Sequence, residues 1–260
     1  MNFDSAQLGI ILPAFIAGLL VTATHVPLGM QVLARGIVFI DLAVAQTAGL
    51  GVIVADAIGF EPQGAAVQVA ALASALVAAL AMTWTEKRWP EAQEAIIGVV
   101  FVLAASGAVV LLAGNPRGGE HLSQLLVGQI LWTSTAWLPR VAVAYSVILV
   151  LWFGAGEKLG RVGFYSLFAV AVTISVQLVG LYLVFATLII PALATRALGR
   201  ARLSAAYAIG ALGYFGGLFI SVWADLPPGA LIPWTMAVFA LALGTLASRF
   251  ARRSESTSTG

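Results

Sequence analysis

The sequence has no cysteine and only two histidines among its 260 residues. Without cysteine, the chain can form neither a disulfide framework nor a thiolate metal site. A closed structural zinc site takes four ligands, most often nitrogen and sulfur atoms, so two histidines alone do not supply one. A transported ion must be released again, so its site can be a sparse set of oxygen and nitrogen ligands. The sequence can provide such a set.

Charged residues are also scarce. Only 9% of the residues are Asp, Glu, Lys or Arg, whereas 61% are hydrophobic and the mean hydropathy is +1.01. A soluble domain carries roughly 25% charged residues, so this chain has too little polar surface for a water-soluble globule. The composition predicts an all-α integral membrane protein, a polytopic bundle of eight or nine transmembrane helices. We expect one transmembrane domain over residues 1–248 and a Ser/Thr-rich, disordered cytoplasmic tail over residues 249–260.

The apolar runs are close to the length of about 20 residues at which a helix crosses a bilayer. Seven runs are expected to span: residues 8–26, 36–55, 65–84, 95–113, 136–154, 203–224 and 230–248. The segment 25–29, which contains Pro27, is expected to end the first span. No Lys or Arg precedes that span, which argues against a cleaved signal peptide. Residues 121–132 are too short to span and are expected to lie at the membrane interface.

Residues 162–195 contain no charge over 34 positions, which is long for one crossing and short for two. Gln177 and Gly180 near the middle favour a tight hairpin, but both counts stay open. With two crossings, eleven basic residues fall on the side of Arg35 and only Arg117 and Arg140 on the other. The positive-inside rule makes the side of Arg35 cytoplasmic, so the pI near 9.2 does not indicate nucleic-acid binding.

The second expected span carries a carboxylate, Asp41, and an amide, Gln46. A central carboxylate costs about 2.5–3.5 kcal/mol on insertion scales, so it normally faces a partner or a pathway. Five residues turn an α-helix by about 500°, which leaves the two side chains roughly 140° apart unless the helix contains a π-type turn. The face of Asp41 continues through Ala45 and Ala48 to Val52, and small side chains leave room for an ion or for close helix packing. Asp41 and Gln46 are therefore candidate pathway residues; the alternative is that they bond to polar groups of neighbouring helices.

Five other polar residues are considered, three of them with two interpretations. Glu94 begins the fourth expected span, where a carboxylate also favours the helix N-terminus through capping and the helix dipole. Gln177 is a polar group inside the membrane. Glu120 and His121 are adjacent on the outer side and could offer ligands at an entrance, although a solvated loop explains them equally well. His25 is most simply a histidine at the membrane interface.

The sequence contains no P-loop, dinucleotide fingerprint, kinase set or nucleophile motif. Uphill transport by this chain would therefore draw its energy from a partner ATPase or from an ion gradient. The charged loops at 156–163 and 196–202 are the best candidates for a docking surface on the cytoplasmic side. Their candidate coupling residues are Glu157, Lys158, Arg161 and Arg196.

Five segments together resemble the ABC-3 family, the permease subunits of bacterial zinc, manganese and iron(II) ABC importers. The first, Val32-Leu-Ala-Arg-Gly-Ile-Val-Phe-Ile-Asp-Leu-Ala-Val-Ala-Gln-Thr-Ala-Gly-Leu-Gly51, is similar to the second-helix motif of that family. The others are Glu94-Ala-Ile-Ile-Gly98, Leu125-Leu-Val-Gly-Gln-Ile-Leu131, the segment 179–196 and Asp225-Leu-Pro-Pro-Gly-Ala230. They occur in the order of the family and cover most of residues 8–248.

The resemblance implies a multi-pass homodimer in the bacterial inner membrane, two cytoplasmic ATPase subunits and an extracytoplasmic metal-binding protein. It implies no permanently bound cofactor, since the divalent ion is the transported substrate. Family members carry an Asp and, four residues later, a His in the second helix. Here Asp41 takes the Asp position, whereas Gln46 stands near the His position with a spacing one residue longer. An amide oxygen is a harder and weaker ligand than imidazole, so zinc, the first expectation, would be held less tightly, with manganese or iron(II) next.

Three other classes of function are alternatives to an ABC permease. Uptake by this chain alone would favour a gradient-driven secondary transporter or channel. An intramembrane enzyme needs two convergent catalytic groups, and the spans offer one strong carboxylate. A pure membrane scaffold gives no reason for the insertion cost of Asp41.

Overall fold

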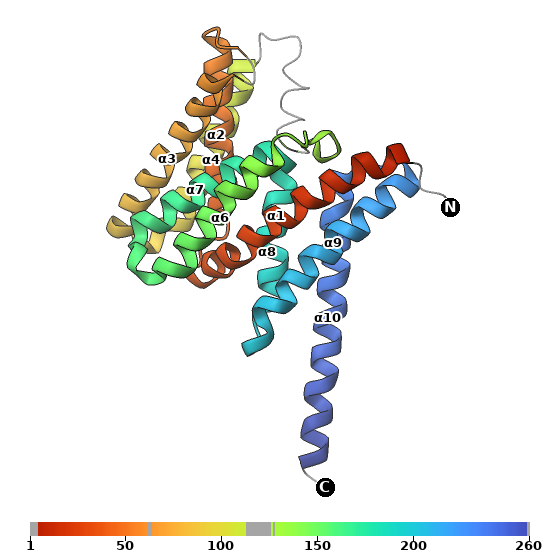
Figure 1. The fold of residues 1–260 in the computed structure, drawn as a ribbon. Helices are drawn as coiled ribbons and strands as arrows, with labels where there is room; N and C mark the ends of the chain where they lie inside the picture. The colour runs from red at the N-terminus through yellow and green to blue at the C-terminus, as the bar shows by residue number, and fades with distance from the viewer. Residues whose placement is uncertain (1–4, 62–63, 113–125, 127, 259–260) are drawn as a thin grey trace.

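The computed structural model describes residues 5–61, 64–112, 126 and 128–258, and the side chains of these except 5–8, 156–157 and 244–258. Within these residues the chain forms nine α-helices and no strand (Figure 1). The helices are α1 (Ser5–Arg35), α2 (Ile40–Ala57), α3 (Ala65–Arg88), α4 (Gln93–Leu112), α6 (Leu138–Ala155), α7 (Gly160–Val179), α8 (Leu181–Ala194), α9 (Arg202–Ala224) and α10 (Pro228–Ser258). Short 3-10 turns lie at Pro90–Ala92, Ile130–Trp132, Gly156–Leu159 and Gly199–Ala201.

Seven helices in the described part of the chain are long and apolar enough to cross a membrane. They are α1, α2, α3, α4, α6, α7 and α9, while α8 and the first part of α10, Pro228–Leu243, are shorter apolar helices. The all-α, polytopic fold class is therefore confirmed. The helix α10 continues past residue 248 as far as Ser258, and the division of the chain at 248/249 stays a prediction.

The expected end of the first span at residues 25–29 is wrong, because α1 runs unbroken from Ser5 to Arg35 through Pro27. A proline inside a helix leaves the carbonyl four residues earlier without its usual N–H partner. Here that carbonyl belongs to Ala23, and the Tyr207 hydroxyl of α9 donates a hydrogen bond to it at 3.1 Å. A neighbouring helix thus satisfies the group that the proline frees, as membrane helices require.

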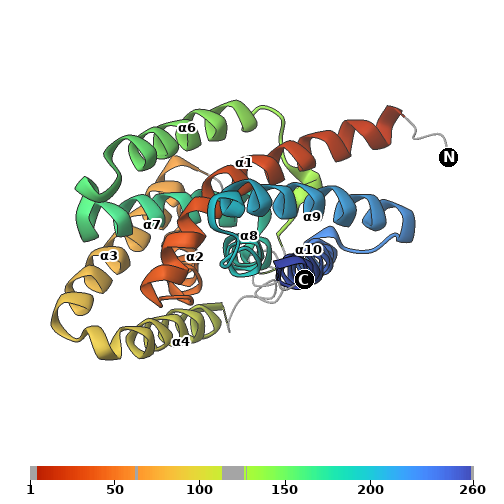
Figure 2. The ribbon, with the colours of Figure 1, turned by 90° about the horizontal axis from the view of Figure 1, so that it is seen from below.

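Helix α2 lies inside the bundle, packed against α3, α4, α7 and α8. Figure 2 shows it surrounded by these helices, while α1, α9 and α10 gather around α8 on the other side. Ten of the 18 residues of α2 are buried, and most of those are Ala, Gly or Val. Small side chains let α3 and α4 approach closely, which places the polar residues of α2 away from lipid.

The uncharged stretch 162–195 forms two helices, α7 and α8, which meet at Gly180. Gly180 has φ 85° and ψ 164°, a conformation that is essentially restricted to glycine. Figure 1 shows α8 turning away from the end of α7, so the stretch contains the turn that Gly180 indicated. The predicted interfacial segment 121–132 lies largely outside the described residues; its end is the 3-10 turn at Ile130–Trp132, where Trp132 is exposed.

Helices α1 and α8 approach closely at Gly29. A Cβ atom at this position would overlap the backbone carbonyl of Leu188, and backbone cannot move aside as a flexible side chain can. Gly29→Ala is therefore expected to lower the free energy of unfolding by about 1–3 kcal/mol through overpacking. Thermal unfolding of the detergent-solubilised protein measures the change. Gly98→Ala is the control, since a Cβ atom there meets nothing within 4 Å; an equal loss in both variants would contradict the assignment.

Candidate functional site

Asp41 lies in the first turn of α2 and is fully buried, with 0% of its surface exposed. The expectation of a carboxylate well inside the span is corrected, because α2 begins at Ile40 and not at residue 36. Neither carboxylate oxygen has a hydrogen-bond partner among the described residues. Its favourable electrostatic neighbours are the backbone amides of its own turn. A buried carboxylate without a partner is costly, so Asp41 is available to a cation.

Glu94, in the first turn of α4, reaches the same place. Its Oε1 accepts a hydrogen bond from the backbone N–H of Phe39, the N-cap residue of α2, at 3.3 Å. Glu94 therefore bonds to the N-terminus of the neighbouring helix, while its place in the first turn of α4 also suits the dipole of its own helix. Its Oε2 is buried without a partner in the described chain, and the carboxylate is close enough to Asp41 to repel it. Asp41 of α2, without any partner in the described chain, and the half-satisfied Glu94 of α4 thus lie at the end of the bundle where α1 also ends.

Gln46 does not join this pair. Helix α2 is α-helical throughout, without a π-type turn, so Gln46 lies about 140° around the helix from Asp41. Its side chain is half-buried. The residues that do share the face of Asp41 are Ala45 and Ala48, both buried, and then the half-buried Val52.

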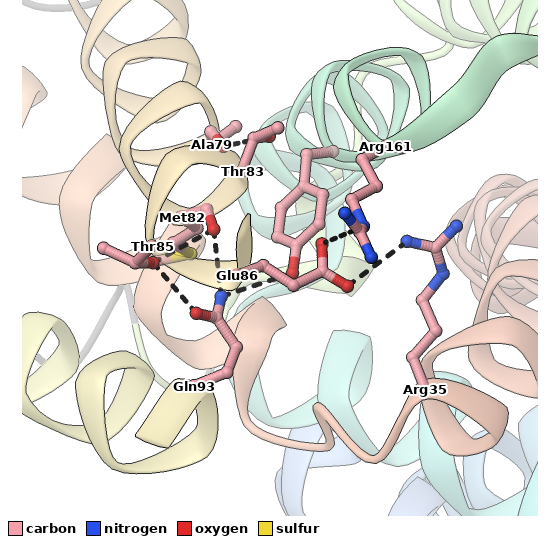
Figure 3. A network of polar contacts seen from close by, with 9 residues as sticks. Arg35, Ala79, Met82, Thr83, Thr85, Glu86, Gln93 and Arg161 are labelled. Carbon is pink, nitrogen blue, oxygen red and sulfur yellow. Dashed lines mark hydrogen bonds and ion pairs between the residues drawn. The ribbon is translucent and has the colours of Figure 1, made fainter. Parts of the chain in front are cut away.

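A network of ion pairs links the ends of α1, α3 and α7 (Figure 3). The carboxylate of Glu86, on α3, lies 3.8 Å from an amino nitrogen of Arg35 and 3.5 Å from Nε of Arg161. The guanidinium of Arg35 also lies over the ring of Phe164, 4.3 Å from its centroid. These contacts tie the end of α1 to the start of α7, the segment that contains the candidate coupling residue Arg161.

Gln93, the first residue of α4, extends the network (Figure 3). Its amide nitrogen donates to the Met82 carbonyl at 3.0 Å and to the Tyr165 hydroxyl at 3.3 Å. Its amide oxygen accepts from the Thr85 hydroxyl at 2.9 Å. One buried amide therefore joins α3, α4 and α7 with all three bonds made, which favours a single packing of these helix ends.

Glu86→Gln is expected to lower the free energy of unfolding by about 1 kcal/mol, since it removes the charge that both arginines face. The pairs are long but partly shielded, with 15% of the Glu86 side chain exposed. Thermal unfolding at low and high salt measures the effect, which should shrink in high salt. Glu91→Gln, an exposed carboxylate on the same side, is the control; an identical response of the two variants would show that the pairs do not stabilise the fold.

The other predicted site residues fall into three groups. Lys158, Arg161 and Arg196 are exposed near the helix ends that carry the network, as docking residues must be. The side chain of Glu157 and both Glu120 and His121 lie outside the described residues. Gln177 is exposed near the opposite end of α7.

The interfacial interpretation of His25 is wrong, since the side chain is fully buried within α1. Its Nδ1 lies 3.1 Å from the Val21 carbonyl and 3.0 Å from the Thr24 hydroxyl, while Nε2 has no partner in the described chain. Among the residues that the structure describes, no three His, Asp, Glu or Cys side chains gather in a group that could hold a metal ion. A tightly closed metal centre is therefore not part of the described bundle.

A family model described as the ABC 3 transport family matches residues 7–162 and 154–247 of the chain. The chain belongs to this family. The five motifs predicted this membership, and it confirms that the chain is a membrane subunit of an ABC transport system and not an enzyme. The two matched ranges leave only the ends of the chain outside the family pattern.

A curated relative from Thermotoga maritima, named "Probable metal transport system membrane protein", is 27% identical over 256 residues, which are 88% of this chain and 87% of that protein. The structure of PsaBC from Streptococcus pneumoniae in complex with Fab is similar, with a TM-score of 0.70, 21% identity and coverage of 93% of this chain and 91% of that one. The structure titled "An inward-facing conformation of a putative metal-chelate type ABC transporter" also has a TM-score of 0.70, at 16% identity, covering 96% of this chain and 90% of that one. Both similarities show that this chain shares the fold of those two structures.

Sequence reasoning missed the role of Glu86. Its partners are 51 and 75 positions away along the chain, and a single sequence does not reveal which distant charges meet. Asp56 lies on nearly the same face of α2 as Asp41, 15 residues later, a relation that the sequence analysis did not note. Fifteen residues turn an α-helix by about four turns and 60°, so the helical period alone could have found it.

Proposed function

We propose that this chain is the membrane subunit of an ATP-driven importer for divalent transition-metal ions, with zinc as the first candidate. The observation that carries the proposal is Asp41, fully buried with both oxygens unpartnered in the described chain, next to a second carboxylate, Glu94. A cation at this point would pair with the carboxylate and so offset the free-energy cost of burying an unpaired charge. The relative named for metal transport, and the family itself, support the same cargo.

Manganese or iron(II) is the second candidate. Zinc comes first on the family resemblance alone, whereas the ligand atoms near Asp41 favour the second candidate. The described polar groups around Asp41 are carboxylate oxygens, and oxygen ligands suit manganese better than they suit zinc. Gln46 would add an amide oxygen as a secondary contact only if α2 rotates during transport. The choice among the three metals therefore depends on measured uptake.

The proposal includes three partners. Two cytoplasmic ATPase subunits would dock on the residues 156–163 and on Arg196, beside the Arg35–Glu86–Arg161 network. A second copy of the chain would complete the translocation path as a homodimer in the bacterial inner membrane. An extracytoplasmic metal-binding protein would deliver the ion at the opposite face, near Glu120 and His121.

The test is metal accumulation in cells that lack their own high-affinity importers. The cells express this chain with its ATPase, either active or inactivated in its own catalytic site, and uptake of zinc, manganese and iron(II) is measured separately. Accumulation of at least one metal that depends on the active ATPase is the expected result. Uptake that is equal with the inactive ATPase would move the chain to gradient-driven transport. No uptake of any of the three metals would refute the proposed cargo.

A further inference from the structure

A cavity of about 700 Å³ lies at the end of α2 and α7 that is farthest from the Arg35–Glu86–Arg161 network. Its walls come from the last turns of α2 and α7, the first turns of α3 and the segment 128–137. The distribution of basic residues assigns this end of the bundle to the outside of the membrane. A cavity of this volume holds many water molecules, each of which takes about 30 Å³ in the liquid.

The polar side chains of the cavity carry oxygen atoms, and one of them is charged. Asp56 supplies a carboxylate, Gln68, Gln129 and Gln177 supply amides, and Thr133 and Thr173 carry hydroxyls. Among the described residues, the lining includes no Lys, Arg or His. Such a wall attracts cations and gives hard oxygen contacts to water molecules bound around a divalent ion.

Thr173 provides a second and independent observation. It is 4% exposed, and its hydroxyl has no hydrogen-bond partner in the described chain. Other buried hydroxyls of the bundle bond to the carbonyl four residues earlier, as Thr22 and Thr187 do at 2.8 and 2.6 Å. Thr173 lines the cavity, but its hydroxyl oxygen is itself buried in the wall. A buried hydroxyl without a protein partner calls for one such as a water molecule at the edge of the cavity.

The cavity is continuous with the face of α2 that carries Asp41. Asp56 and Val52 line the cavity, while Ala48 and Ala45 on the same face are 4% and 3% exposed and closed off by packing. Along the helix, Asp56 and Asp41 are about 22 Å apart. One face of α2 thus has a carboxylate at each end, an open outer part and a closed inner part.

We propose that this cavity is the outer receiving site of the transporter, where Asp56 binds a divalent metal ion together with its hydration shell. The ion is held through its bound water by Asp56 and the three glutamines, and passes along α2 toward Asp41 when the packing at Ala48 opens. The inference rests on the proposed function, since it assigns an outer site to the same cargo. In this assignment Asp56 binds the hydrated ion from the outside, and Asp41 binds it later, on its way through the membrane.

This division of roles predicts a kinetic split. A charged wall raises the local concentration of a counter-ion, so Asp56→Asn is expected to raise the half-saturating metal concentration of uptake about tenfold. The maximal rate should stay within about twofold of wild type, because the step beyond the cavity is unchanged. Asp56→Glu should restore the half-saturating concentration, and higher ionic strength should narrow the difference between wild type and Asp56→Asn.

The measurement is the initial rate of manganese and zinc uptake against metal concentration, in cells that express the full transporter with each variant at equal membrane abundance. Glu61→Gln is the matched control, an exposed carboxylate at the same end of the bundle that does not line the cavity. If wild type transports and Asp56→Asn has the same half-saturating concentration as wild type, the outer site is overturned. The same follows if Glu61→Gln raises that concentration as much as Asp56→Asn does. No uptake by wild type would refute the proposed cargo instead.

A direct binding measurement covers the case in which Asp56→Asn does not reach the membrane. Gln177→Leu removes an exposed amide that lines the cavity, and binding of Mn²⁺ to the purified full chain in nanodiscs is followed by electron paramagnetic resonance. A bound Mn²⁺ signal that is reduced in Gln177→Leu and kept in Glu61→Gln is expected. A signal that Gln177→Leu leaves unchanged would contradict the assignment of this cavity.

Discussion

Asp41→Asn is expected to lower ATP-dependent metal uptake by at least about tenfold, a loss comparable to that seen when metal-site ligands are weakened. The same substitution should leave the folded protein as stable as wild type or more stable. Asp41 is fully buried, and its charge has no partner among the described residues. Because asparagine keeps the shape and removes the uncompensated charge, the cost of burial falls while the attraction for a cation is lost.

This pair of opposite effects separates a pathway carboxylate from a structural one. Uptake is measured together with the unfolding temperature of the purified protein, and Glu91→Gln serves as the control with no expected change in either. A large drop in stability with Asp41→Asn would mean that the carboxylate supports the fold. Uptake equal to wild type would remove Asp41 from the path of the ion.

Gly180→Val is expected to cost about 3 kcal/mol or more in the free energy of unfolding. Gly180 combines φ 85° with ψ 164°, where other residues incur about 1–3 kcal/mol of backbone strain and a β-branched side chain more. Gly180 is also buried, so the added side chain has to displace neighbours. We therefore expect little monodisperse protein after extraction into detergent, and a lower unfolding temperature for what remains.

Gly154→Ala is the matched control for this prediction. Gly154 lies in the last turn of α6, is exposed, and has nothing within 4 Å of an added Cβ atom. Size-exclusion profiles and unfolding temperatures of the two variants are compared with wild type. A Gly180→Val protein that folds and melts like wild type would show that the turn between α7 and α8 does not need glycine.

Composition and hydropathy were sufficient to predict the fold class and most of the spans. The sequence did not reveal where one helix satisfies a polar group of another. Pro27 indicated the end of a helix, but Tyr207 on a distant helix satisfies the carbonyl that the proline frees, so α1 continues. His25 looked interfacial because its position was judged from that false helix end, whereas it is buried within α1.

The candidate site was predictable in part. The presence of a carboxylate in an apolar run was enough to single out Asp41, and the helical period correctly placed Gln46 on a different face. The contact of Glu94 with Phe39 was not predictable, because it joins positions 55 residues apart on two helices whose packing the sequence does not state. The ion pairs of Glu86 depend in the same way on which helix ends meet.

The central claim is that this chain forms an ATP-driven path for a divalent metal ion. Its most direct test is metal accumulation in proteoliposomes that contain the full chain with its ATPase, with zinc, manganese and iron(II) offered separately on the extracytoplasmic face. The account predicts that at least one of these ions accumulates only when ATP is present on the ATPase side, and that Asp41→Asn removes the accumulation. Accumulation without ATP, or transport of none of the three ions by a preparation whose ATPase is active, would contradict it.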